Sequence, residues 1–239
     1  HKQALNDSLA VLQRCERREN PASSHLRGVV SQHLAGVTPL TFSQAKPQLK
    51  LHYKKTEQAH FCLGVRSFKR THPDHYVLSV LATILGGNMS SRLFTEVREK
   101  RGLAYYIKTS IERFHETGHL VTQAGVDVSK IEEAIKVILA EYQKAISVTP
   151  EELKKAKEFL KGRLILTLED SYAVAALYGE SGLLENKIKT PQEIIKGIEK
   201  VTLEDLTRVA KKLFLPKNLN LATIGPYKQE SRFAKILKL

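Results

Sequence analysis

The segment from Leu85 to Tyr106 constrains the fold of this chain most, because its residue pattern changes twice within a short length. Gly86-Gly87 interrupts a helical pattern, and Ser90-Ser91 is expected to cap a second, short amphipathic helix that ends at Gly102. From Leu103 onward, apolar and polar residues alternate, as they do in a strand with one buried face. A helix, a break, a short helix and a strand therefore have to follow one another directly.

Local patterns outline the rest of the chain. Period-two alternation predicts strands at 48–53, 59–65, 103–111, 120–126 and 219–224. Helical periodicity and capping boxes predict helices at 75–85, 129–145 and 150–184, and further helices beginning after Thr190 and Thr202. The long helical stretch is expected to bend or split at its glycines, Gly162, Gly179 and Gly182. Strand pairs beside segregated helices indicate an α+β fold, with a mainly antiparallel sheet and helices packed on one face.

The length of the chain fits one large domain or two small ones. Residues 1–20 can form an amphipathic helix, and residues 21–47 are rich in Pro, Ser, Thr and Gly, as linkers are. We therefore expect an N-terminal helix and linker at 1–47 and the main domain at 48–239.

Charge and cysteine content limit which partners, metal sites and locations are expected for this chain. The net charge is +13, but most lysines alternate with acidic residues along helical patterns and are expected on solvated faces. The sequence contains no nucleic-acid-binding motif and no run of about 18 apolar residues, so we expect neither a specific nucleic-acid partner nor a membrane span. The two cysteines, Cys15 and Cys62, do not suggest a disulfide framework or a Cys-based zinc site, and we expect a cytoplasmic location.

The segment His115-Glu116-Thr117-Gly118-His119 matches the zincin pattern His-Glu-x-x-His. That pattern binds zinc because a helix places both imidazoles on one face, with the glutamate beside the metal-bound water. Here the flanking residues alternate as strands do, and Gly118 would weaken a helix. We therefore predict a polar hairpin turn, with a zinc site at His115, Glu116 and His119 as the less favoured alternative.

Arg98 and Tyr105 are the candidate catalytic residues. The planar guanidinium of arginine can bind a peptide carbonyl or a carboxylate, and a phenol can donate to the oxyanion of a tetrahedral intermediate. The alternative is that Arg98 forms a surface ion pair with Glu96 or Glu99 and that Tyr105 only packs. On residue types alone, the alternative is preferred.

Gly86, Gly87, Ser90 and Ser91 are candidate substrate-binding residues. The glycine pair can allow a backbone or an extended peptide to approach closely, or can simply end a helix. The serines fit a helix cap better than a nucleophile, because no histidine or acid is positioned beside them in the sequence. His60, on an apolar strand, is expected to be a core or edge residue rather than a ligand.

The segment from Leu85 to Tyr106 closely resembles the signature of the second homologous domain in the pitrilysin/insulinase family of zinc metallopeptidases (inverzincins), which includes the mitochondrial processing peptidases. The shared features are Gly86-Gly87, Ser90-Ser91-Arg92-Leu93-Phe94 and Arg98-Glu99-Lys100-Arg101-Gly102-Leu103-Ala104-Tyr105. The order of elements from about Gln48 to Pro226 also resembles one half-unit of the family, whereas residues 1–47 do not match its usual opening strand and helix.

The resemblance implies a division of labour between two similar α+β units that enclose a chamber. One unit binds zinc through His-x-x-Glu-His and a downstream glutamate, and the other supplies an arginine and a tyrosine, which would be Arg98 and Tyr105 here. This chain has no His-x-x-Glu-His. The resemblance therefore implies the non-zinc half of a metalloendopeptidase, which binds no metal itself and is inactive alone.

In that interpretation the partner is a homologous zinc-carrying domain or subunit, and the substrate is an extended peptide held along a sheet edge. The alternative is a catalytically silent scaffold or peptide-binding subunit of the same fold.

Overall fold

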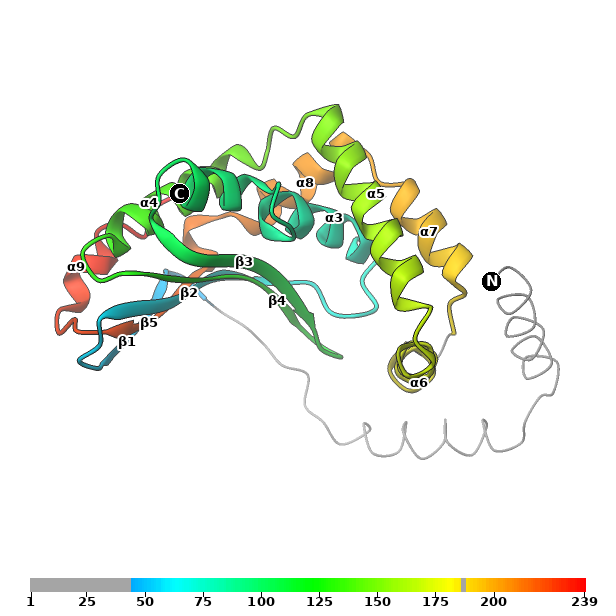
Figure 1. Cartoon of the computed structure of the whole chain (residues 1–239), viewed down its shortest axis with the longest axis horizontal. Coiled ribbons are helices and arrows are strands. Elements are labelled where there is room, and N and C mark those ends of the chain that lie inside the picture. The colour runs from blue at the N-terminus through cyan, green and yellow to red at the C-terminus, as the bar shows by residue number, and fades with distance from the viewer. Residues whose placement is uncertain (1–43, 186–187) are drawn as a thin grey trace. The chain divides into compact units, whose positions relative to one another are not determined.

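Five strands form one sheet in the order β1-β5-β2-β4-β3 in this computed structural model, which describes residues 44–185 and 188–239 (Figure 1). They are β1 (Gln48–Tyr53), β2 (Gln58–Ser67), β3 (Ala104–Arg113), β4 (Gly118–Asp127) and β5 (Leu219–Gly225). β1 and β5 are parallel, and the other three neighbouring pairs are antiparallel. All five predicted strands and the mainly antiparallel sheet are therefore confirmed.

The helices cover one face of this sheet (Figure 1). α3 (His75–Gly86), α4 (Ile131–Lys144) and α8 (Leu203–Leu213) contact the strands directly, and α5 (Pro150–Thr167) and α7 (Pro191–Glu199) pack beside α3. α6 (Ser171–Glu185) follows at the far end of α5. The remaining elements are short: η1 (Phe94–Glu99), η2 (Pro216–Asn218) and α9 (Glu230–Ala234), of which α9 was not predicted.

The alternation of β2 shows why the sheet has one covered and one open face. Ala59, Phe61 and Leu63 point toward the helices and are buried, whereas His60 and Cys62 point away and are exposed. Successive side chains of a strand lie on opposite faces, so the period-two pattern in the sequence is sufficient to orient this strand.

Capping chemistry fixes the starts of three helices as predicted. The capping boxes join Thr149 with Glu152 at α5, Thr190 with Glu193 at α7, and Thr202 with Asp205 at α8. In each box the threonine hydroxyl accepts a helix amide, and the acidic side chain accepts the amide of the threonine.

The predicted break in the long helical stretch lies elsewhere than expected. α5 ends at Thr167 and α6 begins at Ser171, so none of the glycines Gly162, Gly179 and Gly182 marks the break. Asp170 is responsible, because its carboxylate accepts the amide of Tyr172 at 3.0 Å and so caps α6. The helix predicted at residues 1–20 lies outside the described residues.

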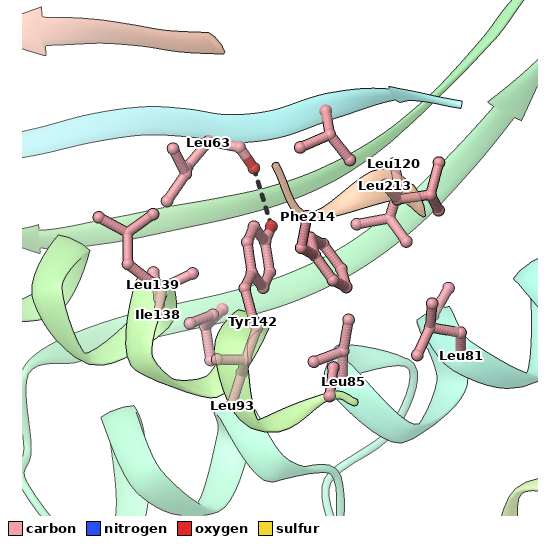
Figure 2. Close-up of a cluster of buried hydrophobic side chains, with 14 of the residues drawn as sticks. Leu63, Leu81, Leu85, Leu93, Leu120, Ile138, Leu139, Tyr142, Leu213 and Phe214 are labelled. Carbon is pink, nitrogen blue, oxygen red and sulfur yellow. Dashed lines mark hydrogen bonds between the residues drawn. The ribbon is translucent and has the colours of Figure 1, made fainter. Parts of the chain in front are cut away.

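A chain of buried hydroxyl groups connects the sheet to α4. The Tyr142 hydroxyl donates to the Leu63 carbonyl of β2 at 3.1 Å, as Figure 2 shows within the surrounding apolar core. The same hydroxyl lies 2.7 Å from the Thr122 hydroxyl, which lies 2.8 Å from that of Thr109. β2, β3, β4 and α4 are therefore tied together at one point. Burial raises the pKa of Tyr142, so its hydroxyl stays a neutral donor.

We expect Tyr142→Phe to lower the free energy of unfolding by about 1–2 kcal/mol, because the buried Leu63 carbonyl and Thr122 hydroxyl lose a partner while the ring stays in place. Urea unfolding of the two proteins measures this difference. Tyr172→Phe is the matched control, since Tyr172 is 80% exposed and its change should stay within about 0.5 kcal/mol. Equal effects of the two variants would contradict the role given to the hydroxyl chain.

Candidate functional site

The candidate site is built on the short helix predicted after Gly86-Gly87. Residues 92–93 are α-helical and lead directly into a π-helix, η1, in which the Lys100 amide donates to the Thr95 carbonyl at 2.9 Å. η1 packs against β3 and α4. The predicted helix is therefore present, but it is wound more widely than an α-helix, as segments at functional sites often are.

The Ser91 carbonyl accepts the Thr95 amide at 3.0 Å, which places Ser91 at the helix start, but neither serine side chain makes the expected capping bond. The amide and hydroxyl of Ser90 both donate to the Asn88 side-chain oxygen at 2.9 Å, and the Ser91 hydroxyl donates to the Asn88 carbonyl at 2.6 Å. Both serines instead stabilise the turn before the helix. Ser91 is buried, whereas Ser90 is exposed.

The close approach predicted at the glycine pair is made within this chain. Gly86 is buried where α3 packs on β3, and a Cβ there would collide with Thr109. Gly86 is therefore not available to a peptide. Gly87 is half-buried and ends α3 as predicted, with its amide donating to the Thr83 carbonyl at 3.1 Å.

Arg92 anchors the start of the short helix. Its guanidinium donates to both carboxylate oxygens of Glu152 at 2.6 and 2.7 Å, to the Lys144 carbonyl at 2.9 Å and to the Ser147 carbonyl at 2.7 Å. Burial raises the pKa of Glu152, but hydrogen bonds from Arg92 and Thr149 outweigh it, so that pKa lies below its usual range. One arginine therefore fixes this helix to the end of α4 and the start of α5.

Gly102 joins the helix to β3. Its φ of 56° is in the left-handed region, which only glycine adopts at little cost. The Gly102 amide donates to the Arg98 carbonyl at 3.1 Å, and the Leu103 amide donates to the Val97 carbonyl at 2.9 Å. These two bonds enclose one residue more than those of a Schellman motif, because the helix that they end is a π-helix. Gly102 therefore ends the helix as predicted.

The Arg98 side chain is exposed, and its guanidinium carbon lies 5.0 Å from the centre of the Phe94 ring. Within the described residues Arg98 forms no ion pair, so the predicted surface pair is absent. Lys100 and Arg101 occupy Glu96 instead, each at 2.6 Å, and their hydrogen bonds hold the pKa of Glu96 below its usual range. Among the described residues, the Arg98 guanidinium therefore binds no carboxylate.

Tyr105 lies in a β-bulge at the start of β3. Ala104 pairs with Val126, yet Tyr106 pairs with the adjacent Gly125, so Tyr105 is the extra residue of its strand. It is 53% exposed rather than packed. Bulges are common beside active sites, because they redirect a side chain out of the regular alternation.

Tyr106 forms a contact that the sequence did not suggest. Its hydroxyl lies 3.3 Å from the His60 ring nitrogen Nδ1, and the two rings are stacked with centroids 6.0 Å apart. A side chain at Gly125, which lies between them, would collide with the Tyr106 ring. His60 is therefore neither a core nor an edge residue, but the β2 member of an exposed aromatic pair that reaches across β4 to Tyr106 of β3.

The His115–His119 segment is the predicted hairpin turn between β3 and β4. The Phe114 amide donates to the Thr117 carbonyl at 2.8 Å, and Gly118 and His119 already belong to β4. The helix that a zincin motif requires is not formed. In the part of the chain that the structure describes, no group of three or more His, Cys, Asp or Glu side chains could hold a metal ion.

Comparison with known proteins points to one family. A protein-family model described as the peptidase M16 inactive domain matches residues 21–160. A protein from Bacillus subtilis (strain 168), named uncharacterized zinc protease YmxG, is 38% identical over 176 residues, which are 72% of this chain and 42% of that protein. A Mycobacterium leprae (strain TN) protein, named uncharacterized zinc protease ML0855, is 35% identical over 196 residues, which are 81% of this chain and 44% of that protein.

A solved structure agrees with these sequence matches. A protease from Helicobacter pylori superimposes with a TM-score of 0.73 at 25% identity, covering 80% of this chain and 47% of that chain. The chain thus spans less than half the length of the relatives that it matches.

Gly102→Ala tests the backbone conformation between η1 and β3 without adding a steric clash, because a Cβ at Gly102 would contact nothing within 4 Å. We expect this variant to lower the free energy of unfolding by about 1–2 kcal/mol through the positive φ alone. Gly162→Ala is the matched control, since Gly162 lies inside α5 with equally open space around it. That variant should raise the free energy of unfolding by about 0.5–1 kcal/mol. Urea unfolding reports both, and the same sign for both would refute the assignment.

Proposed function

This chain belongs to the family of the peptidase M16 inactive domain, and from that membership we propose that it is the non-zinc half of a zinc metalloendopeptidase. In this proposal a homologous unit holds the zinc ion that activates water for attack on a peptide carbonyl. That unit lies either in the same polypeptide or in a separate subunit. This chain closes the chamber, binds an extended peptide and presents Arg98 and Tyr105 to the scissile bond.

The proposal rests on the exposure of the Arg98 and Tyr105 side chains, and on the fact that Arg98 forms no ion pair among the described residues. Arg98 has an exposed guanidinium, and Glu96 on the same helix is held by Lys100 and Arg101. Tyr105 is turned outward by a bulge. A scaffold needs neither feature, whereas a site that binds a carbonyl and stabilises an oxyanion needs a guanidinium and a phenol that are both unengaged.

The place of Tyr105 in the sheet also suits peptide binding. β3 is an edge strand of the described sheet, and Tyr105 lies at its first bulge. An extended peptide that added to this edge would pass Tyr105 with its backbone carbonyls directed toward the strand. Arg98 lies near the end of η1, seven residues before Tyr105 in the sequence. The two residues would then hold the peptide and donate hydrogen bonds to the carbonyl oxygen as it gains charge.

We expect Tyr105→Phe to lower kcat of the assembled enzyme, this chain together with its zinc-carrying unit, by about 10²-fold, as loss of one oxyanion donor does. Tyr106→Phe is the matched control, because its neighbouring hydroxyl contacts His60 instead. That control should change kcat less than about threefold. Steady-state hydrolysis of a quenched fluorescent peptide measures both. An unchanged kcat in Tyr105→Phe, with zinc bound, would favour the silent scaffold.

We expect Arg98→Ala to lower kcat/KM of the same assembled enzyme by about 10²-fold, because the substrate loses a charge-assisted hydrogen-bond donor. Lys136→Ala removes a positive charge from the exposed side of α4, and it should leave kcat/KM within about threefold. If both variants reduced kcat/KM equally, the effect would come from the net positive charge of the chain rather than from the Arg98 fork.

A further inference from the structure

Helix α6 has the composition of a buried helix, although it is largely exposed in this chain. Its sequence, SYAVAALYGESGLLE, places apolar residues on all sides, and only Ser181 is buried. Tyr172 is 80% exposed and Leu183 is 58% exposed. A helix that is apolar all round normally lies inside a protein. The environment that matches this composition is therefore missing from the described part of the chain.

The few charged residues of α6 do not offset its apolar composition. Glu180 and Glu185 are its only charged residues. Glu180 pairs with Arg70 at 3.1 Å, and Glu185 pairs with Lys189 at 2.7 Å, so both are engaged with this unit. A surface helix usually buries its apolar side and exposes its charges. α6 exposes one of its two charges, Glu180, but most of its remaining surface presents large apolar side chains to solvent.

The apolar surface continues onto the end of α5. Ile165 is 55% exposed and Leu166 is 68% exposed, directly before the turn that leads into α6. We name the exposed apolar side chains of these two helices the α5–α6 surface; they are Ile165, Leu166, Tyr172, Leu183 and Leu184. Adjoining exposed apolar residues of this kind mark contact sites in soluble proteins.

We propose that the α5–α6 surface is the docking site for the zinc-carrying unit of the assembled peptidase. The inference rests on the proposed function for the identity of that unit. The matched relatives are more than twice as long as the matched segment, since it makes up 42% and 44% of their length, so they contain a further unit of comparable size. Burying this surface against that unit gives α6 the apolar environment that its composition requires.

Two other occupants fit less well. Helices that lie on a lipid surface are rich in Lys and Arg on their polar side, and α6 contains neither residue. None of the helices within 44–185 and 188–239 is both long and apolar enough to cross a membrane. A second copy of this chain would cover the same surface, but the length of the relatives already supplies a partner in each molecule.

Thiol labelling tests the proposal directly. Tyr172→Cys is made in a background where Cys15 and Cys62 are replaced by serine, and Lys136→Cys on the exposed side of α4 is the matched control. In the 239-residue chain both introduced thiols should react readily with a maleimide. In the assembled enzyme, the labelling rate at position 172 should fall at least about tenfold, while the rate at position 136 stays within about twofold. Leu166→Cys is a second probe if Tyr172→Cys fails to assemble.

Each outcome separates the explanations. Equal labelling at position 172 in both forms would overturn the docking surface, whatever the activity of the enzyme. Protection that already occurs in the 239-residue chain, rises with its concentration and coincides with a dimer in analytical ultracentrifugation would assign the surface to a second copy and also overturn it. Protection only on assembly, in a protein that binds no zinc and cleaves no peptide, would retain the docking surface and reject the proposed function.

Discussion

The contact between Gly86 and Thr109 determines where the candidate site can lie. Because Gly86 has no side chain, the end of α3 rests on β3, and the Thr109 hydroxyl meets Thr122 beneath it. Thr122 in turn meets Tyr142, so α4 is fixed to the same part of the sheet. η1 begins shortly after Gly86 and packs on both β3 and α4, and its position therefore follows from these contacts. A larger residue at 86 would displace the helix that carries Arg98 as well as the core beneath it.

Within that short helix, two arginines have opposite roles. All three guanidinium nitrogens of Arg92 donate within the protein, forming four hydrogen bonds to Glu152, Lys144 and Ser147. Among the described residues, Arg98 contacts the face of the Phe94 ring and forms no ion pair. On the same helix, Lys100 and Arg101 both pair with Glu96. These two basic residues thus hold an acidic side chain that Arg98 was expected to pair with.

The sequence was informative where the signal is local. Strand alternation, capping boxes and the glycine at position 102 each act within a few residues, so they predicted the sheet, three helix starts and the helix end correctly. Ser90 and Ser91 misled because their hydroxyls are turned back to donate to Asn88 instead of accepting a helix amide. Asp170 carried a usable signal, an acidic cap before an apolar run, which was overlooked in favour of the glycines. The Tyr106–His60 pair could not be predicted, since it needs the register of three strands.

The residues that fit their surroundings worst share one property. Arg98 and Tyr105 expose polar groups without partners among the described residues, and α6 exposes apolar side chains without cover. Exposed apolar side chains cost free energy in water, whereas an exposed guanidinium or phenol is hydrated and stays available to a ligand. Each would be satisfied by contact with a second body: a peptide carbonyl for Arg98 and Tyr105, and a folded unit for α6. Under the proposals made above, these two features would mark separate contacts, one for a substrate and one for a partner.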